Sequence, residues 1–428
     1  MPPPHAPDTA TITPPAQQDH HAPGQVDSGF GFKGFVALIA SIMACNALQI
    51  DSMLAALPTM GRDLGVTNEN DRQWIIAVYM LGFGAAQLVY GPLADRYGRR
   101  PILILSLCLN ALTSLGAALA PSFATMLVAR ALQGVTGAAG RVLVVSIVRD
   151  CYQGRQMARV MSLSFVVFLA VPILAPSIGQ FILLFAGWRD IFLVLALFAA
   201  AVALVGAVRL KETLHPRFRR PASIGGVLDT MRMTLTERYA LGYMLASAIT
   251  YGALMGYINT VQQIFTDIFH APRQFPLMFA LAAAGMGVAA LVNSRIVGRF
   301  GTRRVSHCAL IGMITMAGVH VMVSASGYET MLSFSILQCG TMFFFGMIGS
   351  NFGSMAMETM GPIAGTASSV QGFAQSCIGA IIGIAIGQSF NGTTLPTTAG
   401  FLVVGLAGLV IVLVTERGKL FRPHHAPA

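Results

Sequence analysis

Charged residues are scarce in this sequence, and tryptophan and closely spaced cysteines are scarcer still. Asp, Glu, Lys and Arg together make up 10% of the 428 residues, against roughly 25% in soluble chains. This scarcity excludes an ordinary soluble domain. The six cysteines are scattered and none forms a C-x-x-C pair, so we expect no disulfide and no metal site, and we assign no cofactor.

Hydrophobic residues take the place of the missing charges. They account for 55% of the chain, and the mean hydropathy is +0.68. A membrane-spanning helix needs about 20 apolar residues, so roughly a dozen spans fit into a chain of this length. The sequence therefore predicts an all-α membrane protein that crosses the lipid bilayer many times.

Composition divides the chain into five segments. A tail rich in Pro, His and Gln comes first, and a basic, proline-containing stretch separates two long apolar parts. We expect a disordered cytoplasmic tail, a six-helix bundle, a cytoplasmic linker, a second six-helix bundle and a short cytoplasmic tail at residues 1–32, 33–208, 209–238, 239–416 and 417–428.

Basic residues lie mainly on one side of this predicted topology. About 21 Lys and Arg residues fall on the side that holds the termini, and about 4 fall on the other side. Cytoplasmic loops carry such an excess, so we place both termini in the cytoplasm and expect an even number of spans. This topology explains the formal charge of +10 without a nucleic-acid partner.

A short basic pattern occurs twice, about 203 residues apart. It reads Arg-Tyr-Gly-Arg-Arg at 96–100 and Arg-Phe-Gly-Thr-Arg at 299–303. Parallel repeats joined by a central loop are known in transporters. We therefore expect twelve transmembrane helices in two pseudo-symmetric six-helix halves.

Three motifs carry a resemblance to a known family. The loop after the second predicted span reads G-x-L-A-D-R-x-G-R-R from Gly91. The fourth span reads R-x-x-Q-G-x-x-G from Arg130, and the fifth contains Pro172, Pro176 and Gly179. These motifs resemble the major facilitator superfamily, and within it the drug:proton antiporters of the Bcr/CflA type, the bicyclomycin/chloramphenicol-resistance branch.

The resemblance implies a fold and a function. It implies the major facilitator fold and a monomer in the cytoplasmic (inner) membrane of a bacterium, which exports drug-like small molecules in exchange for protons by alternating access. The alternative is a metabolite exporter or proton symporter of the same fold with a narrow polar or anionic substrate. A membrane enzyme is not expected, because the spans contain no catalytic constellation and the loops are short.

One acidic and one basic side chain fall at equal depth in the predicted bundle. Asp51 lies about seven residues before the end of the first span, and Arg130 about seven residues after the start of the fourth, so both are about 10 Å below the outer edge. We expect this pair to couple the proton, and the resemblance implies that Arg130 acts in proton release. The alternative is an ion pair that only locks two helices.

The substrate site is the next prediction. Arg141 has no acidic partner at its depth, so it either faces the cavity and selects anionic or strongly polar substrates, or extends to the cytoplasmic interface. The second half carries amide and aromatic side chains instead of charges. The residues expected to bind substrate are Asp51, Arg130, Arg141, Tyr257, Asn259, Gln263 and Gln371.

Gating residues are implied by the resemblance. In the family, the loop after the second span latches the two halves in the outward-facing state, and the proline motif of the fifth span seals against proton leak. Plain topological charge and an ordinary kinked helix are the alternatives. The residues expected to gate are Gly91, Asp95, Arg96, Gly98, Arg99, Arg149, Pro172, Pro176 and Gly179.

Overall fold

The computed structural model describes residues 26–216, 219, 224–360 and 363–421, and every regular element among them is helical. The predicted all-α class is therefore confirmed; residues 1–25 and 422–428 of the two predicted tails lie outside this description. The long helices are α1 (Phe32–Asp51), α3 (Trp74–Tyr97), α4 (Arg99–Ala118), α5 (Phe123–Cys151), α6 (Gly154–Leu183), α7 (Trp188–Arg209), α8 (Ile224–Thr236), α9 (Arg238–Gln263), α10 (Phe275–Phe300), α11 (Thr302–Ala325), α12 (Met331–Met357), α13 (Ala364–Gln388) and α14 (Leu395–Thr415).

Eleven helical segments of the described chain are long and apolar enough to cross a membrane. One further long helix, α6, has 30 residues and contains the apolar stretch Ala170–Leu183. Together with α6 these segments make twelve, which is the predicted number of spans. Large apolar side chains such as Leu112, Leu204 and Val414 are exposed on the outside, as expected of a surface that contacts lipid chains.

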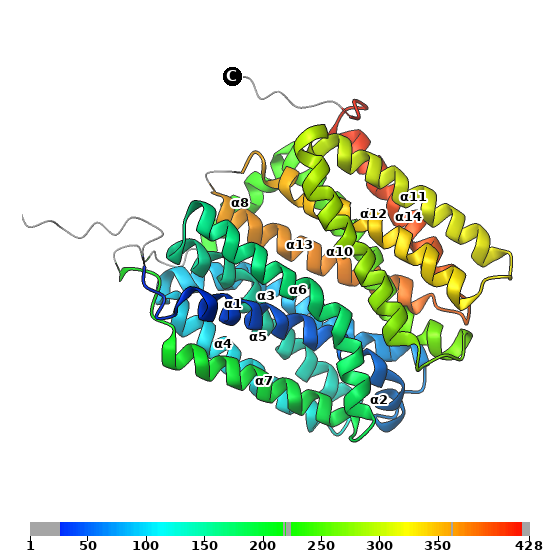
Figure 1. Cartoon of the computed structure of the whole chain (residues 1–428), viewed down its shortest axis with the longest axis horizontal. Helices are drawn as coiled ribbons and strands as arrows, with labels where there is room; N and C mark the ends of the chain where they lie inside the picture. The colour runs from blue at the N-terminus through cyan, green and yellow to red at the C-terminus, as the bar shows by residue number, and fades with distance from the viewer. Residues whose placement is uncertain (1–25, 217–218, 220–223, 361–362, 422–428) are drawn as a thin grey trace, which may run out of the picture.

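The spans form two bundles, which Figure 1 shows as a blue-to-green group and a yellow-green-to-red group. In the first bundle α3 packs on α5, α4 on α7 and α1 on α6. In the second, α9 packs on α13 and α14, while α10 and α11 pack on α12. The bundles meet chiefly where α3 packs on α13 and α6 packs on α10.

The first span is interrupted directly after Asp51. There α1 ends, the 3₁₀ turn η1 (Leu54–Ala56) follows, and α2 (Leu57–Asp63) continues the span. Pro58 has no N–H to donate to the carbonyl of Leu54, which favours the start of a new helix at this point, and Pro58 lies in the first turn of α2. The carboxylate therefore lies where the regular backbone ladder stops.

The predicted linker contains a helix that the sequence did not indicate. This helix, α8, packs on α9 and α13. At the start of the linker, Lys211 Nζ lies 2.6 Å from Asp27 Oδ2, and this hydrogen bond lowers the pKa of the exposed Asp27 carboxyl. We call the end of the molecule that holds the linker the linker end. The opposite end, which holds η2 (Glu69–Gln73) and the π-helical turn η4 (Ile264–Ile268), is the far end.

Candidate functional site

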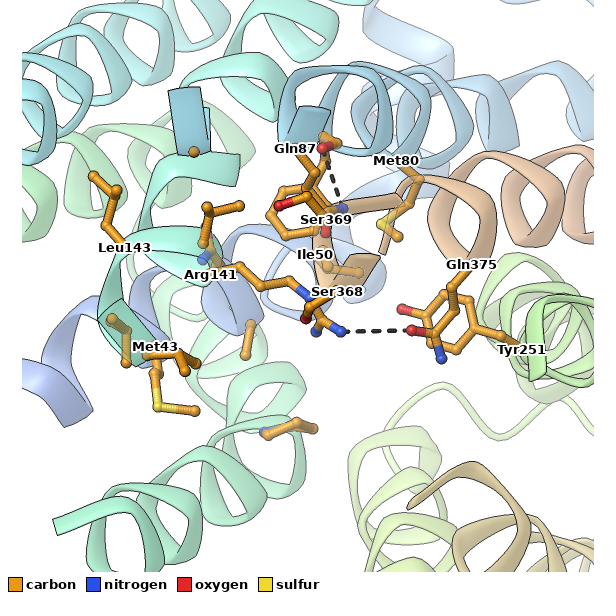
Figure 2. A pocket seen from close by; sticks show the side chains of 18 of the residues that line it. Met43, Ile50, Met80, Gln87, Arg141, Leu143, Tyr251, Ser368, Ser369 and Gln375 are labelled. Carbon is orange, nitrogen blue, oxygen red and sulfur yellow. Dashed lines mark hydrogen bonds between the residues drawn. The ribbon is translucent and has the colours of Figure 1, made fainter. Parts of the chain in front are cut away.

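A cavity of about 820 Å³ lies between the two bundles. Asp51, Tyr257 and Phe279 border its deep part, and Asp95 and Arg149 border its mouth at the linker end. Figure 2 shows side chains of both bundles facing this space. Other residues in its wall include Met80, Arg141, Tyr251, Met286, Met342 and Gln375.

Asp51 brings a buried carboxyl group to the deep part of this cavity. Asp51 is 5% exposed, and its Oδ1 has no hydrogen-bond partner among the described residues. An isolated charge is unfavourable in such a place unless a partner or water compensates it. Asp51 is therefore a buried acidic residue whose Oδ1 is available to a ligand or to water.

Arg130 does not contact Asp51 in the described structure. It is fully buried, its Nε donates to the Ile75 carbonyl of α3 at 3.1 Å, and its Nη1 donates to Gln133. Its guanidinium lies over the Tyr79 ring, 4.4 Å from the centroid. The Tyr79 hydroxyl group is close enough to the side chains of Arg130 and Asp51 to interact electrostatically with both. The expected direct contact of the two charges is therefore absent among the described residues.

Close packing of α5 on α3 explains this orientation. A Cβ on Gly134 would lie 2.0 Å from the Tyr79 carbonyl oxygen, and one on Gly82 would lie 2.3 Å from the Ala131 carbonyl oxygen. Glycine at both positions permits this approach of the two backbones. Arg130, one turn before Gly134, is consequently directed at α3 and not into the cavity.

Arg141, in contrast, lines the cavity. Its Nη2 donates to Gln375 Oε1 of α13 at 3.5 Å, across the space between the bundles (Figure 2). Within the described chain no carboxylate oxygen lies within 4.0 Å of this guanidinium. Of the two alternatives for Arg141, the structure has the one in which it faces the cavity.

The loop after α3 is anchored within its own bundle and the linker. Gly98 has φ +105°, a conformation that L side chains rarely adopt, and Arg99 N donates to Glu212 Oε1 at 3.0 Å. Arg99 Nε lies 2.9 Å from Asp150 Oδ2, and Arg99 Nη2 lies 3.7 Å from Asp95 Oδ1. Asp95 and Arg99 border the cavity mouth. No hydrogen bond or ion pair described for the side chains of Asp95, Arg99, Asp150 and Glu212 reaches the second bundle.

The remaining loop residues differ in their surroundings. Gly91 and Arg149 border the cavity. Arg96 is exposed, and its guanidinium lies 5.0 Å from the centroid of the Tyr97 ring. Of these three, only Gly91 and Arg149 are placed to respond directly when the cavity changes shape.

The proline motif of α6 contacts the break in the first span. Pro172 lines the cavity and Pro176 is buried. A Cβ on Gly179 would lie 1.8 Å from the carbonyl oxygen of Ser52, the residue that follows Asp51. The motif glycine thus allows α6 to lie directly against the backbone next to the buried carboxyl.

Amide side chains join the two bundles at the far end. Gln73 Nε2 donates to Gln263 Oε1 at 2.5 Å and to the Gly387 carbonyl at 3.1 Å. Asn70 Nδ2 donates to the Phe390 carbonyl at 2.9 Å, and its Oδ1 accepts from Gln263 at 3.0 Å. We call these five residues the far-end closure. Gln263 therefore belongs to the closure and not to the cavity wall.

The predicted substrate residues separate into two groups. Asp51, Arg141 and Tyr257 line the cavity, and the Tyr257 ring stacks on Phe279 with centroids 6.0 Å apart. The others are outside its lining in this structure. These are Arg130, Asn259, Gln263 and Gln371.

Packing accounts for the two amides not yet placed. Asn259 is buried beside Gly387 near the far end, and its Oδ1 has no partner among the described residues. Gln371 packs close to Gly353. In their place the structure puts Tyr251 and Gln375 in the wall. The amide and aromatic residues of α9 and α13 indicated that these helices could line a site. The sequence does not tell which of those residues face the cavity.

Comparison with known proteins decides the family. The family model described as Major Facilitator Superfamily matches residues 39–384. The chain is a member of the major facilitator superfamily. The transporter is 34% identical over 379 residues to an uncharacterized MFS-type transporter, YdgK, of Bacillus subtilis, covering 87% of this chain and 92% of that protein.

Two further relatives and one solved structure extend this comparison. A bicyclomycin resistance protein homolog of Haemophilus influenzae is 28% identical, covering 90% of this chain and 96% of that protein. Multidrug resistance protein MdtL of Escherichia coli O157:H7 is 26% identical, covering 88% and 94%. The crystal structure of the human organic anion transporter MFSD10 has a TM-score of 0.65 at 17% identity, covering 90% of the transporter and all of that chain, and it supports the fold. The expected membership and fold are confirmed.

Proposed function

We propose that this transporter exports drug-like small molecules in exchange for protons, with Asp51 as the residue that takes up and releases the proton. The observation that carries the proposal is a buried carboxyl without a hydrogen-bond partner at Oδ1, in the wall of a cavity between two bundles. The names of two relatives, a bicyclomycin resistance protein homolog and a multidrug resistance protein, support export as the direction.

The membrane orientation follows from charge. The excess of Lys and Arg on the linker side favours a cytoplasmic location for the linker end and both termini. In that orientation, in the inner membrane of a bacterium, the cavity reaches toward the cytoplasm and the far-end closure faces outward. A monomer suffices, because one chain supplies both bundles of the cavity.

Transport then requires the two bundles to rock about the cavity. Opening the far end breaks the amide contacts of Gln73 and Asn70, and closing the linker end brings the loop from Gly91 to Arg99 toward the second bundle. Substrate and proton would exclude one another because both alter the surroundings of Asp51. A proton that crosses 100 mV supplies about 2.3 kcal/mol for each cycle.

The sign of the response to a pH gradient tests the proposal. In inside-out vesicles with an acidic lumen, an antiporter accumulates bicyclomycin in the lumen, and collapse of the gradient stops accumulation. A proton symporter of the same fold would move its substrate out of the lumen under the same gradient. Accumulation that does not respond to the gradient would remove proton coupling from the function.

A further inference from the structure

Arg141 is a basic side chain of the cavity wall, and no carboxylate oxygen of the described residues lies within 4.0 Å of its guanidinium. Arg149 is eight residues further along α5, about 12 Å closer to the linker end, and Arg99 is paired with Asp150 at 2.9 Å. A guanidinium carries five N–H donors. One N–H group of Arg141 is directed at Gln375, at the long distance of 3.5 Å. The other N–H groups of this side chain have no acceptor among the described residues.

The surroundings of Arg141 combine polar and apolar groups. Tyr251 of α9 is close enough to Arg141 and Asp51 for its hydroxyl group to interact electrostatically with both side chains. Met286, Met342 and Phe279 add apolar and aromatic surface to the same cavity. A ligand that fits this wall has an apolar or aromatic body and one group that accepts hydrogen bonds from a cation.

Closure of the cavity makes the missing counter-charge important. While the cavity is open, water solvates the guanidinium. Alternating access removes that water, and an unpaired cation at membrane depth is strongly unfavourable. Asp51 is on another helix and its carboxylate is not within 4.0 Å of Arg141. The cavity therefore closes most easily around a molecule that brings a negative charge of its own.

We infer that the transporter selects substrates that carry an anionic group, such as a carboxylate or sulfonate, on an apolar or aromatic body, and that Arg141 and Gln375 bind this group. The inference rests on the proposed function in one respect, since it takes the cavity as the substrate site. Arg149 at the mouth adds a second positive charge along the path of an entering anion. Charge-assisted hydrogen bonds from a guanidinium to such a group are short and strong.

Two fluorescent probes that differ in one charged group test this inference. 8-Anilino-1-naphthalenesulfonate is an anion, and N-phenyl-1-naphthylamine has the same aromatic body without the sulfonate. Both are titrated into the purified full-length protein in detergent, and the ratio of their affinities is compared. In Arg141→Gln we expect the preference for the sulfonate to fall about ten- to a hundredfold, as for loss of one hydrogen-bonded charge.

Control variants separate charge recognition from general damage. Arg141→Lys keeps the charge and should restore part of the preference, while Arg155→Gln removes an exposed charge outside the cavity and should leave it unchanged. If Arg141→Gln does not yield folded protein, Arg141→Met is the second neutral variant. A preference that is the same in wild type and in the neutral Arg141 variants, or lost equally in Arg155→Gln, would overturn the inference.

The result is independent of proton coupling, because the titration uses no gradient. Vesicles in which bicyclomycin accumulation ignores the pH gradient would overturn the proposed function. The ratio of probe affinities would still decide whether Arg141 binds an anionic group.

Discussion

Two buried charged residues of the first bundle, Asp51 and Arg130, have different surroundings. Arg130 lies over the Tyr79 ring and donates to α3, whereas Asp51 remains in the cavity wall without a partner at Oδ1. A direct ion pair would have favoured a permanently charged carboxylate. In the proposed mechanism Asp51 changes its protonation while Arg130 keeps its hydrogen bonds to Ile75 and Gln133.

Replacement of Asp51 should stop coupling without unfolding the protein. Asp51→Asn keeps the size of the side chain and removes the titratable group. We expect accumulation of bicyclomycin in acid-loaded inside-out vesicles to fall to the level of vesicles without the transporter. Asn46→Ala, in the same cavity wall, is the matched control for a polar side chain of α1. Unchanged accumulation in Asp51→Asn would exclude this carboxyl from the mechanism.

Arg130 should be a stabilising residue in its own right. Arg130→Lys retains the charge but cannot make both the bond to Ile75 and the bond to Gln133 with the same geometry. Buried partners left unsatisfied should lower the free energy of unfolding by about 1–3 kcal/mol. Thermal unfolding in detergent measures this loss, with the exposed Arg155→Lys as control. Equal unfolding temperatures would mean that these contacts add nothing to stability.

Sequence reasoning was strongest for residue types and weakest for side-chain direction. The motif glycines Gly134 and Gly179 both lie against a neighbouring backbone. Equal depth predicted that Asp51 and Arg130 would meet, but depth fixes only one coordinate. The rotation of α5 about its axis, set by Gly82 and Gly134, decided where Arg130 points.

At the scale of elements, the break in the first span and the kinked α6 form one unit. The sequence predicted that the span ends at Pro58, whereas the structure continues it through α2 to Asp63. Proline explains both observations, since it interrupts a helix without preventing a new one from starting at its own position. The contact of Gly179 with Ser52 depends on tertiary packing and was not predictable from spacing alone.

Gly179→Ala should disturb this unit. The added methyl would lie 1.8 Å from the Ser52 carbonyl oxygen, so α6 or the break in the first span must move. We expect a loss of stability of about 1–3 kcal/mol, as for overpacked cores, together with reduced export. Gly206→Ala in α7, where no atom lies within 4 Å of the added methyl, is the control. A variant as stable and active as the control would show that the contact is loose in the membrane.

In the whole molecule, the two bundles enclose a cavity that reaches the linker end. At the far end they are joined by hydrogen bonds. Composition and loop charges predicted the helices, the halves and the side of the termini. They could not predict which end is closed, because both states use the same helices and differ only in contacts between bundles. Gln263 is an example. Its amide side chain was expected to bind substrate, but in the structure it takes part in the far-end closure.

Weakening the far-end closure should shift the population toward outward-open molecules. In Gln73→Ala/Gln263→Ala the hydrogen bonds between η2 and α9 are lost. Spin labels at positions 68 and 273, in a background without the six native cysteines, should report a longer distance between the two bundles at the far end. Gln153→Ala, an exposed amide at the linker end, is the control. An unchanged distance distribution would mean that these amides do not hold the far end shut.

Proton release from the purified transporter is the most direct measure of whether Asp51 exchanges the proton. The compound that accumulates most strongly in the vesicle assay is added to the protein in weakly buffered detergent solution, and the pH is followed. We expect the wild type to release protons when this compound binds, and Asp51→Asn to bind it without release. Equal release from both proteins would contradict the assignment of proton exchange to this carboxyl group.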